Sequence, residues 1–375
     1  MNRFRSILCG CALALAVTGE GARAQAPPAK PPRPAAAPDA ASVERRLLEA
    51  VRRTPDAFDA HHALGEFYIH AGKLAAAIPH LERARTLDPG HYANGYDLAL
   101  AYLETGALDA ARQQVRRMLE AKETAELFNL LGDVDARAGD YVAAAVGYQR
   151  AARLAPTEEH LFDWGDNLLR LRAYDDAVDV FAAAVRRHPA SARLHIGLGI
   201  AQYSRGRHEE AVASFCTAAD LAPADPRPYA FLGEMYGVSP AQSDEISKRL
   251  ARFVALKPAD ANGQYYYAMS LWRAPATGDG PDLAKVEALL RKAAALDARH
   301  AKARVQLGIL LSEQRRWREA IQALRAAVAL EPDLAQAHFR LAQAYRRTGQ
   351  AALADRELAE FERLKARDPA PPVPE

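Results

Sequence analysis

The sequence has few cysteines and, after its first residues, no long apolar stretch. Two of its three cysteines, Cys9 and Cys11, lie in an N-terminal segment that we expect to be removed. Cys216 then has no partner in the same chain, so stability must come from packing and not from disulfide bonds. We expect a buried, inert thiol at Cys216, with pairing between chains as the lesser alternative. No later stretch is long and apolar enough to span a bilayer.

An excess of basic residues is also absent. The formal net charge is +2 over the whole chain, and removal of residues 1–24 leaves a formally neutral protein. Nucleic-acid-binding domains carry a basic patch or stripe, because they must neutralise phosphates. The charge therefore argues against a nucleic-acid partner.

Catalytic and metal-binding motifs are missing as well. The sequence contains no His-Glu-x-x-His, no phosphate-binding loop, no Gly-x-Ser-x-Gly and no paired-cysteine site. The nearest approach to a cluster is His61, His62 and His70. His62 and His70 are eight residues apart, about 12 Å along a helix, so they cannot share one ion. We expect solvated or groove-lining histidines, no catalytic activity, no cofactor and no metal.

The N-terminus is typical of a secretory signal peptide. A basic start precedes the apolar run 7–17, and Ala22-Arg23-Ala24 offers a small-x-small cleavage site before Gln25. The run Leu8-Cys9-Gly10-Cys11 loosely resembles a lipoprotein box, which would leave a lipidated Cys11. Most of the apolar run follows that cysteine instead of preceding it, so lipidation is the lesser alternative.

The chain does contain a small-residue pair that recurs at steps of 33 to 35 residues, and once of 40. The first residues of these pairs are Leu64, Leu98, Leu131, Trp164, Leu198, Leu232, Tyr267, Leu307 and Leu341. A column of alanines shares the period, at Ala77, Ala111, Ala144, Ala177, Ala211, Ala320 and Ala354. Each unit predicts two amphipathic helices of about a dozen residues joined by a turn, too small to bury their own apolar faces. Stacked neighbours would supply the missing core.

This pattern resembles the tetratricopeptide repeat, whose period is about 34 residues. The resemblance covers residues 56 to 366 in nine units. It implies an all-α, right-handed superhelical solenoid with an N-terminal half-repeat as cap.

The predicted organisation follows the repeat phase. The segments are a signal peptide (1–24), a Pro/Ala-rich linker (25–40), a capping helix (41–57), a first sub-array (58–236), an irregular region (237–282), a second sub-array (283–367) and a disordered proline-rich tail (368–375). In the irregular region the alanine column becomes Ile246 and Val286, and the turn after Trp272 lengthens. We interpret it as a kink, and a tolerated surface insertion is an equal alternative.

The resemblance also implies a binding surface, because the inner face of such a superhelix is lined by first-helix positions. Residues at those offsets are acidic on balance in repeats one to four and aromatic or apolar, flanked by arginine, in repeats five to seven. They are Asp59, His62, Glu66, Tyr96, Asn129, Asp133, Arg137, Phe162, Asp166, Arg170, Arg193, Ile200, Tyr203, Arg227, Tyr265, Met269 and Trp272. For the tyrosines at 265 and 266, packing within the kinked stack is an equal alternative.

These observations predict a non-catalytic scaffold or adaptor in a bacterial cell envelope, exported to the periplasm, that binds an extended peptide or helix of a partner protein. The lysine and asparagine clamp of chaperone-tail-binding relatives is absent, because His62, Glu66 and Asp97 occupy those positions. The alternative is a glycan-binding protein of polysaccharide export or cell-wall processes, in which Tyr203, Tyr265 and Trp272 would stack on sugar rings. The sequence gives neither the partner's identity nor the oligomeric state.

Overall fold

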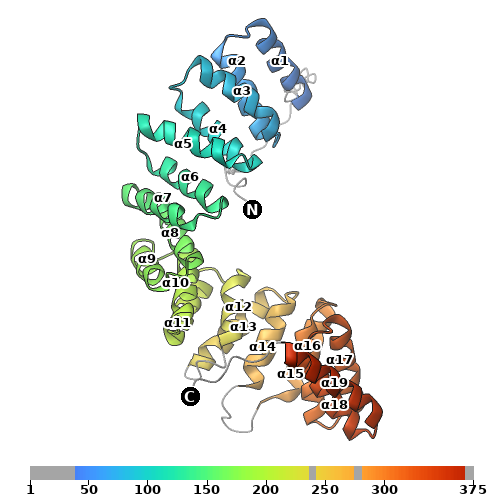
Figure 1. The fold of residues 1–375 in the computed structure, drawn as a ribbon. Helices are drawn as coiled ribbons and strands as arrows, with labels where there is room; N and C mark the ends of the chain where they lie inside the picture. Colours follow the sequence, from blue (N-terminus) through green and yellow to red (C-terminus); the bar gives the residue numbers. More distant parts are fainter. Residues whose placement is uncertain (1–38, 236–241, 274–280, 368–375) are drawn as a thin grey trace, which may run out of the picture.

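Paired helices stacked into a curved array make up the protein (Figure 1). The computed structural model describes residues 39–235, 242–273 and 281–367. The predicted signal peptide, nearly all of the linker, the tail and parts of the irregular region lie outside these residues. The described part holds nineteen helices and no strand, which confirms the all-α solenoid.

The helices follow the repeat phase. Helix α1 (Ala40–Arg53) precedes nine pairs, at the place expected for the cap. The pairs are α2 (Phe58–His70) and α3 (Leu74–Leu87), α4 (Tyr92–Thr105) and α5 (Leu108–Ala121), α6 (Ala125–Arg137) and α7 (Tyr141–Leu154), α8 (Glu158–Arg170) and α9 (Tyr174–Arg187), α10 (Ala192–Ser204) and α11 (His208–Leu221), α12 (Pro226–Met235) and α13 (Ser243–Leu256), α14 (Ala261–Trp272) and α15 (Leu283–Leu296), α16 (Ala301–Glu313) and α17 (Trp317–Leu330), and α18 (Ala335–Arg347) and α19 (Ala351–Arg367). No described helix is long and apolar enough to cross a membrane.

The turn inside a pair needs one residue in the left-handed backbone region. Five repeats place glycine there, with φ between 69° and 84°. Two repeats instead place Arg172 (φ 58°) and Arg315 (φ 59°) in this conformation. Glycine adopts it without strain, whereas a Cβ makes it costly.

Small residues let the two helices of a pair approach closely. All seven members of the alanine column are fully buried, as the pattern predicts. A glycine of the small-residue pair lies against a bulky side chain of the second helix: a Cβ at Gly165 would stand 2.5 Å from the Phe181 ring. A Cβ at Gly197 of the next repeat would meet the same ring at 2.4 Å, so Phe181 joins two repeats.

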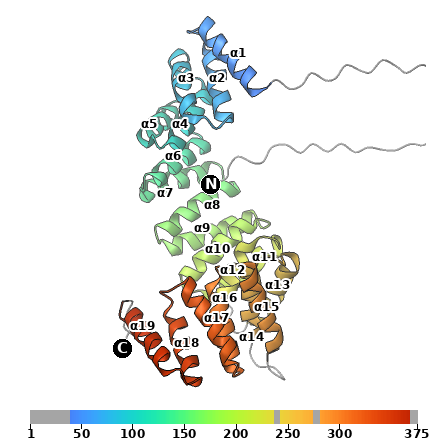
Figure 2. The same ribbon diagram turned by 90° about the vertical axis from the view of Figure 1, so that its right-hand side faces the viewer.

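Repeats six and seven pack differently. A Cβ at Gly233 on α12 would meet Tyr266 of α14 at 2.2 Å, so this glycine faces the next first helix instead of its own second helix. Ile246 and Val286, in place of the column alanines, are fully buried. Figures 1 and 2 show that the array turns here, with α14–α19 extending sideways from the end of the α1–α11 stack.

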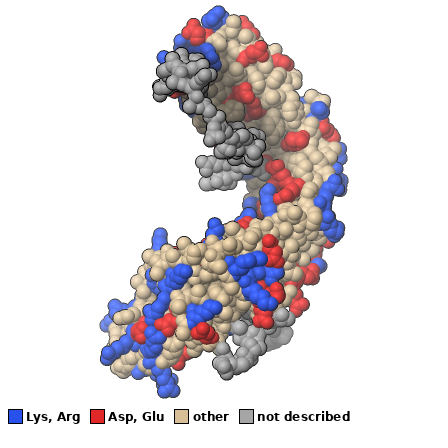
Figure 3. All heavy atoms as spheres, turned by 180° about the vertical axis from the view of Figure 1, so that it is seen from behind, with Lys and Arg blue, Asp and Glu red and all other residues tan. Residues whose placement is uncertain are grey.

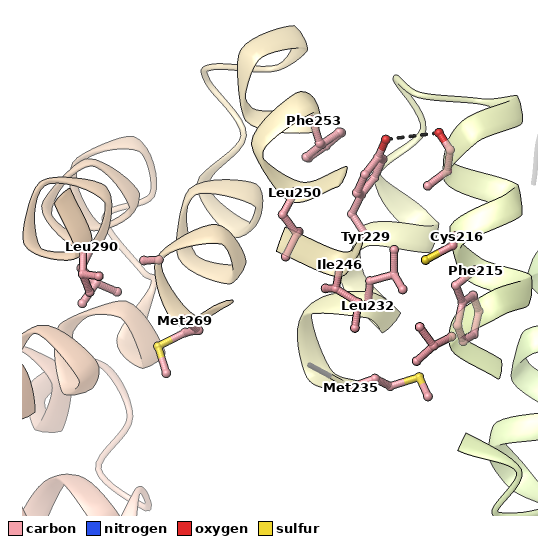
Figure 4. Packing of buried hydrophobic residues seen from close by; sticks show 14 of the residues in the cluster. Phe215, Cys216, Tyr229, Leu232, Met235, Ile246, Leu250, Phe253, Met269 and Leu290 are labelled. Carbon is pink, nitrogen blue, oxygen red and sulfur yellow. Dashed lines mark hydrogen bonds between the residues drawn. The ribbon is translucent and has the colours of Figure 1, made fainter. Parts of the chain in front are cut away.

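One continuous core cluster runs through the turn from α10 to α17, and Figure 4 shows part of it. Phe215 and Cys216 of α11 pack near Leu232 of α12 and Ile246 of α13. The Tyr229 hydroxyl donates a hydrogen bond to the Ala219 carbonyl. Burial raises the pKa of the Cys216 thiol, in agreement with the inert thiol that the sequence predicts.

Candidate functional site

The inner side of the array is the candidate binding surface. Figure 3, from behind, shows the molecule as an arc with one hollow side. The first helix of each repeat supplies the predicted groove residues, and the structure divides them into an N-terminal, a middle and a C-terminal section.

The N-terminal section combines carboxylates with histidine. His62 on α2 lies 3.3 Å from the Asn94 side-chain oxygen of α4, and its ring stacks on Phe58. Burial raises the pKa of Asp97, which faces both His62 and Glu66. Asp59 and Glu66 are exposed, and Tyr96 is half-buried beside this group.

The other histidine of the pair, His61, faces away from this section. Its Nε2 contacts the Pro55 carbonyl at 3.0 Å, and its Nδ1 lies 3.3 Å from Nδ1 of His80 on α3. No group of histidine, cysteine or carboxylate side chains within the described residues is arranged to hold a metal ion.

The middle section brings three predicted residues together around a fourth. Asn129 of α6 donates from Nδ2 to Asp163 of α8 at 3.1 Å. Arg193 of α10 lies 3.6 Å from the same carboxylate, with its guanidinium 3.5 Å above the Phe162 ring. Asp163 is not among the residues predicted from the sequence, although it follows Asn129 by one 34-residue step. Three first helices thus share one hydrogen-bonded and stacked set of side chains.

Several predicted charges are already paired within the array. Tyr148 donates to Asp133 at 2.9 Å, and Arg170 pairs with Asp166 at 3.0 Å within one helix turn. Arg137 lies 3.4 Å from Glu104 of the preceding first helix. Arg227 is exposed but bonds to Asp225 in its own turn. These hydrogen bonds and ion pairs hold the charged groove side chains in place, so much of their charge is already paired within the array.

The structure corrects two of the predicted groove residues. Met269 is 3% exposed and packs in the core cluster of the turn, so its prediction as a surface residue is wrong (Figure 4). Asn129 is 6% exposed and positions Asp163 instead of presenting its own amide. Met269 is buried because the array turns here, which brings this face of α14 against neighbouring helices.

The predicted aromatic stretch is mostly packed. Tyr265 lies 5.1 Å from the His300 ring, and Trp272 packs against two core clusters. Ile200 is also partly buried against the turn cluster. Tyr203, by contrast, is 44% exposed. Tyr265 therefore fits the alternative of packing within the stack, whereas the Tyr203 ring is exposed to solvent.

The C-terminal section holds a cavity of about 550 Å³ that the sequence analysis missed. First helices α16 and α18 and the start of α17 form it. Its lining comprises Ile309, Ser312, Glu313, Trp317, Arg340, Gln343, Arg346 and Arg347. The first-helix offsets used for repeats one to seven, continued into repeats eight and nine, would have found most of these residues.

Arg340 lies in the wall of this cavity with part of its guanidinium unsatisfied. Its Nη1 donates to the Gln343 side-chain oxygen at 3.3 Å. Its Nε is buried and has no hydrogen-bond partner among the described residues. A buried donor without a partner loses the hydrogen bond it would make with water.

Comparisons with known proteins agree on the fold. Models described as tetratricopeptide repeat match residues 39–92 and 162–226 in one case and 68–134 in another, and a model described as TPR repeat matches 308–349. Together these matches cover more than half of the chain. No curated protein matches it.

Several solved structures are similar to this chain. The C-terminal part of a TPR repeat-containing protein from Cytophaga hutchinsonii is 15% identical, with a TM-score of 0.52, over 75% of this chain and 99% of that one. PilF of Pseudomonas aeruginosa is 18% identical, with a TM-score of 0.44, over 60% and 99%. YrrB, a TPR protein described as having an unusual peptide-binding site, is 21% identical, with a TM-score of 0.41, over 49% and 96%.

Proposed function

Because the chain belongs to the tetratricopeptide repeat family, we propose that it is a non-catalytic scaffold that binds an extended peptide or a helix of a partner protein along its inner face. The observation that carries the proposal is the middle section, where Asp163, Arg193 and Phe162 from neighbouring repeats form one connected surface. Arginine and aromatic side chains held rigidly in place are the usual anchors of protein interfaces.

The partner meets this surface without large rearrangement of the groove. The stacking of Arg193 on Phe162 and the bond from Asn129 to Asp163 fix the side chains before binding, so less side-chain entropy is lost on association. Tyr203, ten residues after Arg193 on α10 and so about 15 Å farther along the helix, offers an exposed aromatic contact. Repeats four and five thus supply charged and aromatic contacts, and Asn129 of repeat three holds Asp163 in place.

Glycan binding is less well supported by this geometry. Stacking on sugar rings needs flat aromatic faces that are open to solvent. Of the three aromatics in that alternative, Tyr265 faces His300 and Trp272 packs between two clusters, whereas Tyr203 alone is exposed.

The proposal includes export. The predicted signal peptide supports a protein that acts in the bacterial envelope, in the periplasm. Fractionation with N-terminal sequencing tests this part: a periplasmic chain that starts at Gln25 supports it, and a cytoplasmic chain that retains Met1 contradicts it.

Photo-crosslinking tests the binding function. A photoreactive amino acid is placed at Tyr203 and, separately, at Glu66, and the matched control position is Val146, which is 68% exposed on α7, a second helix. We expect a discrete protein adduct from the first two positions and none from Val146. A synthetic peptide of the captured segment should bind the purified protein and lose affinity about tenfold in Arg193→Ala, since an interface arginine contributes on the order of 1–2 kcal/mol.

Other outcomes would contradict the proposal. Polymer adducts at Tyr203 would favour glycan binding. Equal adducts from Tyr203 and Val146, or a peptide that binds Arg193→Ala as tightly as the wild type, would exclude the inner face as the binding surface.

A further inference from the structure

We propose that the cavity between α16, α17 and α18 binds an acidic segment of the partner, in which two carboxylate side chains three residues apart flank a bulky apolar residue. The inference rests on the proposed function, because it takes the cavity as one section of the peptide-binding face. It names the chemistry of the segment that this section accepts.

The cavity lining carries an excess of positive charge. Three arginines line the cavity, against one glutamate, Glu313. Arg346 has its nearest carboxylate, Asp355, at 3.8 Å, with both side chains more than 60% exposed. Arg347 forms no ion pair within the part of the chain that the structure describes. The cavity therefore carries positive charge that the protein itself does not neutralise.

Arg340 lines the cavity, and its guanidinium makes only one hydrogen bond within the described residues. A ligand carboxylate in the cavity would accept from the guanidinium nitrogens that the cavity reaches, and charge-assisted hydrogen bonds of this kind are about twice as strong as neutral ones. Gln343 already holds Nη1 of the same guanidinium, so the fork is oriented before a ligand arrives. Arginine's planar fork matches a carboxylate better than a lysine would.

The spacing of the arginines fixes the spacing of the acids. Arg340 and Arg347 are seven residues apart on α18, so they lie on the same face at about 10 Å along the axis. An extended segment in the polyproline II conformation returns to the same side every three residues, over about 9 Å. Two acidic residues at positions i and i+3 would therefore reach both arginines.

The apolar lining lies between these charges. Ile309 of α16 and Trp317 of α17 form part of the wall. Ile309 belongs to the core cluster of repeats eight and nine, and Trp317 packs against it. A volume of about 550 Å³ lies inside the range of about 300–1,000 Å³ that is typical of ligand pockets, and it is larger than carboxylates alone would fill. An apolar side chain between the two acids would cover the tryptophan and exclude water from the ion pairs.

The experiment measures fluorescence anisotropy with the mature chain and two amidated, fluorescein-labelled peptides. The acidic probe is Gly-Ser-Glu-Leu-Ser-Glu-Ser-Gly, and the neutral probe has glutamine in place of both glutamates. We expect the neutral probe to bind at least tenfold more weakly. Arg340→Gln and Arg347→Gln should each weaken the acidic probe at least fivefold, and Arg340→Lys should recover only part of the loss because it lacks the fork.

Arg356→Gln is the matched control. This arginine is exposed on α19, a second helix, and does not line the cavity, while its removal changes the net charge by the same amount. We expect less than a twofold effect. Circular dichroism of each variant establishes that the arrays remain folded.

Three results with the probe peptides would overturn the inference, and a fourth comes from the captured segment. They are equal affinity for the acidic and neutral probes, an equal loss in Arg356→Gln and Arg340→Gln, and displacement of the acidic probe by inorganic phosphate at low millimolar concentration. The last result would identify a phosphate site. If the segment captured at Tyr203 binds wild type and Arg340→Gln equally, the inference fails while the proposed function stands. If no protein is captured at Tyr203, the proposed function itself fails.

Discussion

In the regular repeats and at the turn of the array, a first-helix glycine packs against a bulky side chain, but that side chain comes from a different helix in the two regions. In repeats four and five, Gly165 and Gly197 close on the ring of Phe181, a second-helix residue. In repeat six, Gly233 closes on Tyr266, a residue of the next first helix. A glycine at the contact position permits close approach, but it does not determine which helix approaches.

The alanine column explains the difference. Where the second helix carries alanine, it can lie against the first helix of its own pair. Where Ile246 takes that position, its larger side chain fills the space between α12 and α13, and α12 packs more extensively on α14 than on α13. In repeat six, a larger column residue thus accompanies a change in the helix on which the first helix packs.

The largest expected effect comes from the ring that joins two regular repeats. Phe181→Ala should lower the free energy of unfolding of repeats four and five by about 3–5 kcal/mol, because it removes a fully buried ring that two glycines contact. Tyr266→Ala should cost clearly less, since that side chain is half-buried. Urea unfolding with hydrogen exchange of each repeat measures both, and equal losses would contradict the comparison.

The second prediction adds a methyl group at each glycine. Gly165→Ala and Gly233→Ala should each cost about 1–3 kcal/mol, because the new Cβ would overlap Phe181 or Tyr266. Combining Gly233→Ala with Tyr266→Ala should restore part of the loss, with a coupling energy of about 0.5–3 kcal/mol. Gly165→Ala combined with Tyr266→Ala serves as the control, since these sites do not touch, and its effects should add.

The third prediction concerns pH at the start of the turn. Burial alone would raise the pKa of Asp220 on α11, but hydrogen bonds from Arg249 and Arg252 of α13 outweigh it and lower the pKa below its ordinary 3.8. A carboxylate whose folded pKa is depressed contributes stability above its unfolded pKa and loses it as the pH falls through the folded value. Because Asp220 is 42% exposed, we expect less than about 1 kcal/mol.

Hydrogen exchange of α13 between pH 5 and pH 2 measures this contribution. Its protection should fall further in the wild type than in Asp220→Asn, which has no charge to lose. If both proteins lose protection equally, the ion pairs do not stabilise the α11 to α13 contact.

The smallest expected effect lies in the turns inside the pairs. Arg172→Gly and Arg315→Gly should each stabilise the fold by up to about 1 kcal/mol, because glycine relieves the left-handed strain but increases the entropy of the unfolded chain. Arg172 belongs to a regular repeat and Arg315 follows the turn of the array. Similar gains in thermal unfolding would show that the turn geometry does not depend on the kink, and unequal gains would link the two.

The sequence predicts the fold well because the same contacts recur in successive repeats, so the pattern that marks them appears several times. The period, the turn glycines and the alanine column all mark backbone positions, and the structure confirms the all-α array that they indicate. Ile246 and Val286 also mark where packing changes. What they do not encode is the direction of the change, which depends on the shapes of several side chains together.

The groove residues are harder to predict, because their exposure also depends on how several side chains pack together. Fixed offsets predict exposed side chains. Tyr203 is exposed, whereas Met269 is buried where the array turns and Asn129 is buried beside Asp163. Asp163 was missed because a carboxylate beside an arginine and an amide becomes evident only when three repeats are brought together. The C-terminal cavity was missed because the offsets were not continued past Trp272.

The shared ring of Phe181 also has a mechanical consequence. When each repeat contacts only its neighbours, an array pulled from both ends unravels unit by unit, and the force at each step follows the strength of the local joint. Phe181 couples repeats four and five, so these two units should yield together as one longer extension step. An array stretched between two anchored partners would then lengthen in steps of unequal size.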